Sequence, residues 1–420
     1  MIFKLFNFFK NKNIPFVIIN GYKDIVEQID TESDTDILLR KNDFSAIERI
    51  LKEFSYEHNL KIVQVLHHDL WAKNIFLFNP ENGKYLNLDL YGELSRKEIV
   101  FFQEKDIFNA LSVYENIPIL SPEKEFLNYL IKKLDKDEFS ESTFNYLYSL
   151  YKKNVSICEK VIKDFFPRKH SKVLAGFQEN NFELIQSNRE EIINDFYTLK
   201  KYDLKRKLLN SLRTFKRIVK PTGISIAFLG SDGSGKSTVI DGLLENRLPF
   251  RRKDYFHLKP IVSKKSVIEN EMITDPHKYE PYSEAKSYIK LLYFIYQYNL
   301  GWIKNVLRLK IKSSLVIFDR YYDDLLVDHK RYRYGGSKTV AKIARLFIPK
   351  PDLYFILTTD PKVIYARKQE VPFEELERQV KAYRELADTK RYFNIDVNKV
   401  PEEIVQEIIL IIMEKMNERY

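Results

Sequence analysis

The chain has very little cysteine and no long hydrophobic run. Its 420 residues contain a single cysteine, Cys158, so a disulfide within the chain is excluded and a reducing compartment fits. No apolar stretch approaches the roughly 18 residues that span a bilayer. Residues 1–10 are too short and too mixed for a signal peptide. We expect a cytoplasmic protein without a transmembrane segment, in which residues 1–10 either lie on a membrane surface or pack as a short helix on the first domain.

An acidic excess is also lacking. The chain has 69 Lys and Arg residues against 59 Asp and Glu residues, which gives a net charge of +10 spread along its length. We interpret this charge mostly as a solvated basic surface, so no nucleic-acid partner is expected. The length favours two or three domains.

A glycine-rich segment follows a short apolar run in the second half of the chain. Residues 224–229 predict a buried parallel strand, and residues 239–244 predict the start of a helix. Between them lies G-x-x-x-x-G-K-S, the phosphate-binding P-loop in its required context. Its backbone N–H groups and the positive end of the helix attract phosphate. The residues expected to bind the nucleotide are Gly230, Gly233, Ser234, Gly235, Lys236, Ser237 and Thr238, with Lys236 on the β- and γ-phosphates and Ser237 on Mg²⁺.

Further motifs follow this segment in order. An apolar strand over residues 314–318 ends at Asp319-Arg320, which places both side chains at the carboxyl edge of a parallel sheet, where such sheets bind ligands. Asp319 is expected to orient Mg²⁺, and Arg320 to pair with a phosphoryl group. A strand over residues 353–357 leads to a helix with Arg367 and Lys368, and a strand over residues 392–395 leads to the last helix.

Residues 221–420 resemble thymidylate kinase. The resemblance is carried by Gly-x-Asp-Gly-x-Gly-Lys-Ser-Thr at residues 230–238, Asp-Arg-Tyr at 319–321, Pro-Asp-Leu at 351–353, and Asp-Pro at 360–361 leading to Ala-Arg-Lys at 366–368. It implies an α/β P-loop fold and ATP-dependent phosphoryl transfer. Some members of the family place an arginine inside the P-loop, where this chain has Gly233, so the catalytic cation is expected from Arg367 or Lys368, with Arg378 as a further candidate. The resemblance also implies that Asp232 faces the acceptor.

The acceptor motifs of that family are missing. Residues 257–260 read His-Leu-Lys-Pro where the family has Arg-Glu-Pro-Gly-Gly-Thr, and the Ala-Tyr-Gln stretch of thymine recognition is absent after Tyr321. In its place, residues 322–336 alternate cations with aromatic residues, a pattern that suits a phosphate or a sugar face. We expect Tyr321, Asp328, Arg331 and Arg333 to bind a small-molecule or glycan acceptor other than thymidine monophosphate. A surface loop without a ligand is the alternative.

Paired aspartates mark the first part of the chain. A strand over residues 15–19 ends at Gly21, and Asp34 and Asp36 share one face of a second strand. Strand-like runs follow at residues 61–66, 73–78 and 85–91, with a hairpin at Asn82-Gly83. The last run contains Asp89. This order resembles the nucleotidyltransferase fold, which implies that the three carboxylates hold two metals against a nucleoside triphosphate. Gly-Tyr replaces the family's Gly-Ser at residues 21–22. The alternatives are an inactive scaffold, or acidic residues that merely end strands.

The chain between these two regions is helical and then basic. Apolar residues recur at helical spacing from residue 121 towards residue 196, and residues 200–220 are rich in Lys and Arg before Pro221-Thr222-Gly223 breaks the helix. The basic run either grips a polyanion or forms a solvated linker helix. We predict an α+β nucleotidyltransferase-like domain over residues 1–120, a helical domain with a basic linker over 121–220, and a P-loop domain with a parallel sheet over 221–420.

The sequence predicts one function and leaves two alternatives open. The first is an ATP- and Mg²⁺-dependent kinase of the thymidylate kinase-like group. The second is a bifunctional nucleotidyltransferase and kinase. The third is a regulatory module that senses ATP without catalysis. A homodimer is an open option for each.

Overall fold

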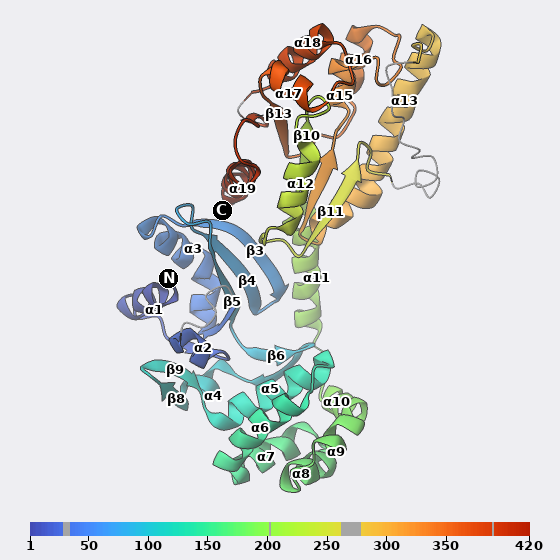
Figure 1. Cartoon of the computed structure of the whole chain (residues 1–420). Helices are drawn as coiled ribbons and strands as arrows, with labels where there is room; N and C mark the ends of the chain where they lie inside the picture. The colour runs from blue at the N-terminus through green and yellow to red at the C-terminus, as the bar shows by residue number, and fades with distance from the viewer. Residues whose placement is uncertain (28–33, 201–202, 262–278, 389) are drawn as a thin grey trace. The chain divides into compact units, whose positions relative to one another are not determined.

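The computed structural model describes residues 1–27, 34–200, 203–261, 279–388 and 390–420 (Figure 1). These residues form two compact units, which are residues 1–213 with Tyr420 and residues 214–419. The division falls within helix α11 (Leu204–Val219). The three-domain organisation expected from the sequence stays a prediction.

The first unit is built on a mixed sheet. Within the described residues its seven strands run in the order β3-β4-β5-β2-β1-β9-β8, and β6 and β7 form a separate pair. Asn82-Gly83 joins antiparallel strands β4 and β5, which confirms the predicted hairpin. The strands are β1 (Phe16–Ile18), β2 (Thr35–Leu39), β3 (Lys61–Asp69), β4 (Ala72–Phe78), β5 (Tyr85–Tyr91), β6 (Leu94–Arg96), β7 (Ile99–Phe102), β8 (Leu111–Tyr114) and β9 (Ile117–Leu120).

Helices pack on this sheet and form a second core beside it. Helix α1 (Ile2–Asn11) buries Leu5, Phe6, Phe8 and Phe9 in the core with α3 (Lys41–Glu57), so residues 1–10 form the short packed helix that was one of two expectations. A second core is shared by α5 to α10 and β6 to β7. The remaining helices of this unit are α2 (Tyr22–Glu27), α4 (Glu104–Phe108), α5 (Pro122–Lys136), α6 (Glu141–Lys153), α7 (Val155–Phe165), α8 (His170–Gln178), α9 (Phe182–Ser187) and α10 (Arg189–Tyr197).

The second unit is built on a parallel sheet, as the sequence predicts. The strand order is β11-β12-β10-β13-β14, and all neighbouring strands are parallel. The glycine-rich segment follows the central strand, so it opens at the carboxyl edge where ligands bind in sheets of this kind. The strands are β10 (Ile224–Leu229), β11 (Arg252–His257), β12 (Ser314–Asp319), β13 (Leu353–Thr358) and β14 (Tyr392–Asp396).

Helices flank this parallel sheet. Alternate side chains of the strands, such as Ala227 and Val316, pack against Leu291 and Phe294 of α13. Helices α12 and α19 pack so closely that a Cβ on Gly242 would come within 2.8 Å of Val405. The helices are α12 (Lys236–Glu245), α13 (Glu284–Gly301), the π-helix η2 (Trp302–Val306), α14 (Leu307–Ile311), α15 (Asp323–Val327), α16 (Lys338–Arg345), α17 (Pro361–Arg367), α18 (Phe373–Arg384) and α19 (Pro401–Asn417).

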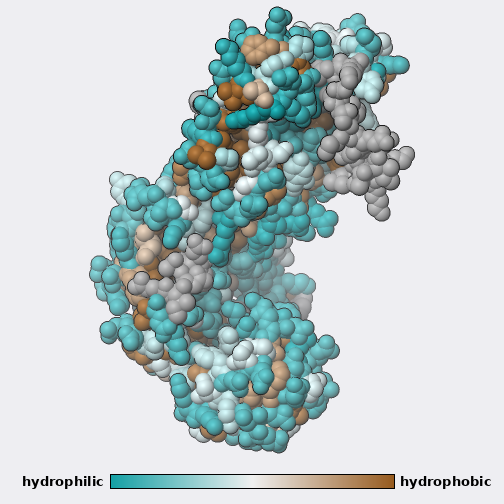
Figure 2. Space-filling view, viewed as in Figure 1, coloured by the Kyte–Doolittle hydropathy of each residue, from teal (hydrophilic) through white to brown (hydrophobic). Residues whose placement is uncertain are grey.

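One face of the molecular surface is mostly polar. Figure 2 shows a visible face that is largely hydrophilic, with apolar residues in separate patches. Within the residues that the structure describes, no helix combines the length and the apolarity that a bilayer crossing requires.

Candidate functional site

The P-loop has the backbone that its sequence predicts. Gly230, Gly233 and Gly235 all have positive φ angles, which L-residues with a side chain rarely adopt. A Cβ on Gly230 would lie only 2.6 Å from the carbonyl oxygen of Leu357 on β13. Gly235 caps the N-terminus of α12, so the unpaired N–H groups of that helix face the loop. The loop is therefore a concave site suited to an anion.

Lys236 lies inside this loop. Its Nζ donates hydrogen bonds to the carbonyl oxygens of Gly230 and Ser231, at 2.9 and 2.8 Å. Burial, assisted by the nearby guanidinium of Arg320, lowers the pKa of Lys236 to about 8. The ammonium is still mostly protonated at neutral pH, and an anionic ligand would stabilise that form.

A cavity of about 580 Å³ opens at this edge of the sheet. It brings together most of the residues that the sequence selects for phosphate chemistry. The lining includes Asp232, Gly233, Gly235, Lys236, Ser237, Thr238, Asp319, Arg320, Arg331, Arg367 and Lys368. Gly230 and Ser234 belong to the loop behind it.

Asp319 ends strand β12 beside β11. Its Oδ2 accepts a hydrogen bond from the Tyr255 hydroxyl at 3.2 Å and lies 3.5 Å from Nδ1 of His257. Burial alone would raise the pKa of Asp319, but His257 and the charge of Lys236 outweigh burial and lower it. Its Oδ1 is buried without a hydrogen-bond partner in the described part of the chain. An ionised carboxylate with one unsatisfied oxygen fits a hard cation such as Mg²⁺.

Arg320 is held in an unusual conformation next to Asp319. Its φ angle is +68°, which is uncommon outside glycine. Its guanidinium is buried and forms ion pairs with Asp232 of the P-loop and Asp324 of α15. Asp232 also pairs with Arg331. Burial alone would raise the pKa of Asp232, but contacts with Glu370 and the Arg320 guanidinium hold it well below its ordinary value.

Known proteins match this second unit. The family model described as thymidylate kinase matches residues 228–408. The C-terminal half is a thymidylate kinase-like domain. The P-loop and the strand-end Asp319-Arg320 pair described above lie within the matched range.

Individual relatives match the same half. A probable thymidylate kinase of Pyrobaculum aerophilum is 27% identical over 190 residues, which cover 44% of this chain and 93% of the relative. The thymidylate kinase of Lactobacillus helveticus is 27% identical over 215 residues, which cover 47% of this chain and 98% of the relative. Solved thymidylate kinases of Ehrlichia chaffeensis and Candida albicans are 19% and 20% identical, with TM-scores of 0.34 and 0.36. They match 45% and 46% of this chain, and 97% and 93% of their own.

The structure distributes the expected acceptor residues unevenly in the thymidylate kinase-like domain. Arg331 lines the cavity, and the backbone N–H of Arg331 donates a hydrogen bond to the carboxylate of Asp328 at 3.1 Å. Arg333 lies over the ring of Tyr282, outside the cavity lining. Tyr321 is fully buried, and its hydroxyl donates to the Pro349 carbonyl oxygen at 2.7 Å. The acceptor roles of these residues stay predictions, and the geometry favours Arg331.

The same domain contains residues that the sequence did not single out for the site. Asp324 is fully buried and pairs with Arg320, while Glu370 pairs with Lys368 at 2.5 Å. Asp324 lies four residues after Arg320, and this i,i+4 spacing was the signal that could have suggested the pair. Arg378 pairs with Glu375 at 2.7 Å instead of lining the cavity.

One motif of the resemblance to thymidylate kinase, Pro-Asp-Leu at residues 351–353, has a structural role. Asp352 precedes β13, at the edge of the sheet opposite the cavity. Its Oδ2 accepts hydrogen bonds from the backbone N–H and the hydroxyl of Ser225 and from Nζ of Lys310, each at 2.7 Å. Asp352 therefore joins the starts of two strands to the helix before β12.

The first unit places two of its three expected carboxylates side by side. Asp36 on β2 is the register partner of Asp89 on β5. Burial, together with the neighbouring Asp36 carboxylate, raises the pKa of Asp89 to about 6. An amide N–H of Asn74 donates to Asp89 at 2.6 Å.

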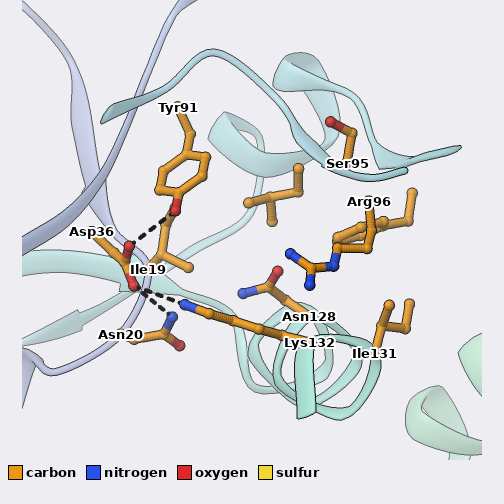
Figure 3. Close-up of a pocket in the computed structure, with 11 residues that line it drawn as sticks. Ile19, Asn20, Asp36, Tyr91, Ser95, Arg96, Asn128, Ile131 and Lys132 are labelled. Carbon is orange, nitrogen blue, oxygen red and sulfur yellow. Dashed lines mark hydrogen bonds and ion pairs between the residues drawn. The ribbon is translucent and has the colours of Figure 1, made fainter. Parts of the chain in front are cut away.

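Protein donors surround Asp36, as Figure 3 shows. Asn20, Tyr91 and Lys132 each point a donor at its carboxylate, at 3.0, 3.2 and 3.3 Å. They line a cavity of about 60 Å³. Lys132 comes from α5, and the sequence gave no signal for it because a lysine on an amphipathic helix ordinarily faces solvent.

The metal site of Asp34, Asp36 and Asp89 stays a prediction. Among the described residues no group of three or more His, Cys, Asp or Glu side chains is placed to hold a metal ion. Asp34 is exposed. The nucleotidyltransferase-like identity of this unit stays a prediction.

Proposed function

We propose that this chain is an ATP-dependent phosphotransferase whose acceptor is a small molecule or glycan other than thymidine monophosphate. The observation that carries the proposal is the cavity in which the P-loop, Lys236 and the Asp319–Arg320 pair meet. Phosphoryl transfer spreads negative charge over the transferred group, so catalysis consists of positioning and of cations placed in advance. This cavity supplies both.

Protein partners hold two of the cations in position, Lys236 and Arg320. Lys236 is buried and hydrogen-bonded to the loop that would hold the phosphates. Arg320 is fixed by two carboxylates. Arg367 and Lys368 reach the same cavity from the end of α17. These residues are proposed to orient the terminal phosphoryl group of ATP and to stabilise the charge that develops on it.

A magnesium ion fits the remaining donors. Asp319, with its unsatisfied Oδ1, and the hydroxyl of Ser237 would hold it. When bound, Mg²⁺ neutralises charge on the phosphate oxygens.

The acceptor side supports a substrate other than thymidine monophosphate. Lys259 and its neighbours follow β11 where thymidylate kinases are expected to carry an arginine and glycine stretch. Arg331, which comes from the segment without a family counterpart, pairs with Asp232 in the cavity. An acceptor would have to contact Asp232 in the presence of that arginine.

Replacement of Lys236 tests the catalytic assignment. Lys236→Ala is expected to lower ATP turnover about a hundredfold or more, because the cation of the phosphate site is lost. Lys286→Ala removes an exposed lysine of α13 and is the matched control. ATP turnover is measured with the full chain and a panel of phosphorylated sugars, nucleotides and alcohols. Unchanged turnover in Lys236→Ala would refute the assignment, and slow hydrolysis that no acceptor stimulates would favour an ATP-sensing module.

Thymidine monophosphate is the decisive member of that panel. We expect its ATP-dependent phosphorylation to be slow compared with that of the best acceptor. Rapid conversion of thymidine monophosphate to the diphosphate would overturn the acceptor part of the proposal and leave the kinase part standing.

A further inference from the structure

Three cations alternate with two aromatic rings beside the proposed acceptor site. Nζ of Lys259 lies 4.4 Å from the ring centroid of Phe294, and Nζ of Lys290 lies 5.7 Å from the same ring. Lys290 is also 5.2 Å from the ring of Tyr282, and the Arg333 guanidinium is 4.3 Å from that ring. The two shared rings therefore link the three like charges into one cluster.

The backbone that carries Lys259 is fixed. The carbonyl oxygens on either side of Lys259 accept hydrogen bonds from Tyr298, at 2.7 Å to Leu258, and from Asn305, at 2.6 Å to Pro260. A Cβ on Gly301 would lie 2.8 Å from Pro260. This close approach presses the helix against the segment, so the position of Lys259 is set before any ligand binds.

The two lysines of this cluster have no carboxylate partner in the part of the chain that the structure describes. Among the described residues, neither Lys259 nor Lys290 forms an ion pair. Lys290 donates instead to the carbonyl oxygen of Tyr332, at 2.5 Å. Burial, reinforced by Lys290, lowers the pKa of Lys259 to about 8, and burial with Arg333 does the same to Lys290. Uncompensated cations of this kind cost free energy that a bound anion would recover.

The cluster borders the catalytic cavity. Lys259 lies two residues after His257, and Tyr332 follows Arg331 directly. Both His257 and Arg331 line the cavity that contains the P-loop. A ligand in contact with Arg331 would therefore need only a short extension to reach the three cations.

We propose that Lys259, Lys290 and Arg333 bind a phosphate group of the acceptor, separate from the acceptor group that receives the phosphoryl group. The acceptor is then a molecule with at least one phosphate remote from the reacting centre. A dianionic phosphate matches a cluster of three cations better than a single carboxylate does. This inference rests on the proposed kinase function and narrows its substrate class.

Lysine NMR with inorganic phosphate as the probe tests this site directly. The lysines of the full chain are dimethylated with ¹³C, and the signals are assigned with Lys259→Met, Lys290→Met and Lys286→Met. Phosphate is expected to shift the Lys259 and Lys290 signals with one common midpoint and to leave Lys286 unchanged. Sodium chloride at matched ionic strength should not reproduce the shift.

A variant separates binding from general screening. Lys259 forms no hydrogen bond through its side chain in the described structure, so Lys259→Met should fold normally. We expect it to raise the phosphate midpoint at Lys290 at least fivefold, while Lys286→Met has no effect. The site is refuted if the Lys259 and Lys290 signals move no more than that of Lys286, or if Lys259→Met leaves the midpoint unchanged.

The phosphate titration tests the anion site independently of the kinase assignment. The same titration in the Lys236→Ala chain should give the same midpoint, because the P-loop lysine takes no part in this cluster. If ATP turnover does not depend on Lys236 but phosphate still shifts the two lysine signals, the kinase assignment is refuted and the anion site is supported. If ATP turnover depends on Lys236 as expected but phosphate does not shift the two lysine signals, only the anion site is refuted.

Discussion

Asp352 offers the sharpest test of how the thymidylate kinase-like domain is held together. Its carboxylate accepts three hydrogen bonds of 2.7 Å, one of them from the buried ammonium of Lys310. Asp352→Ala removes all three and leaves Lys310, which is 9% exposed, without its partner.

The magnitude follows from these contacts. Hydrogen bonds to a charged group contribute about 1.5–3 kcal/mol each. The Asp352 side chain is 28% exposed, so water can replace part of what is lost. We expect the free energy of unfolding of this domain to fall by about 2–4 kcal/mol. For a domain of this size, that lowers Tm by about 4–16 °C.

Calorimetry of the full chain measures the effect. Asp241→Ala, on the exposed side of α12, is the matched control and should change Tm little. Adding Lys310→Met to Asp352→Ala should recover part of the loss, because no charge is then left buried. A loss below about 1 kcal/mol, or a double variant as unstable as the sum of the single ones, would refute the reasoning.

The pH dependence of this effect has a definite sign. Burial alone would raise the pKa of Asp352, but Lys310 and Ser225 outweigh it and lower the pKa below its ordinary value. The stabilisation is therefore fully present above the unfolded-state pKa of about 4. It is lost as the pH falls through the lower folded-state pKa. The difference between the parent chain and Asp352→Ala should shrink at strongly acidic pH.

Three other predictions concern the two cavities. Gly233→Arg, which introduces the P-loop arginine found in some thymidylate kinases, should lower the free energy of unfolding by about 1–2 kcal/mol. The φ angle of Gly233 is +82°, and a Cβ there would lie 3.0 Å from Cβ of Lys368, so a side chain strains the loop. Thermal denaturation measures the change. ATP affinity should fall above pH 8, by up to tenfold per pH unit, because Lys236 with a pKa of about 8 must then take up a proton; calorimetry in buffers of different ionisation enthalpy would reveal that proton, and its absence would contradict the shift. Lys132→Met should raise the pKa of Asp89 above its value of about 6 by removing a nearby positive charge, as followed by carboxyl ¹³C NMR; an unchanged pKa would mean that Lys132 does not compensate these carboxylates.

The regular elements of the second unit could be predicted because their signals are local. Residues 314–318 form a short apolar run that ends in charged residues, and strand β12 (Ser314–Asp319) follows that run. The glycine pattern of residues 230–238 also fixes a backbone, since positive φ angles at three glycines leave few alternatives. Strand β5 (Tyr85–Tyr91) was predicted over the same residues for the same kind of reason.

The partners of charged side chains could not be predicted. Lys132 reaches Asp36 through tertiary packing, across 96 residues of sequence. The spacing of a sequence shows which face of a helix a residue occupies, and it does not show what that face meets. For the same reason the three aspartates of the first unit suggested a metal site, while the structure places a lysine ammonium against Asp36.

The π-helix over Trp302–Val306 interrupts an otherwise continuous run of helix from Glu284 to Ile311. A π-turn accommodates one extra residue, which rotates everything after it relative to everything before it. Lys290 precedes this turn and contributes to the cation cluster, whereas Lys310 follows it and meets Asp352 at the other edge of the sheet. The inserted residue thus sets which faces the two ends of this helical run turn towards the rest of the domain. Lys290 and Lys310 can therefore contact different partners.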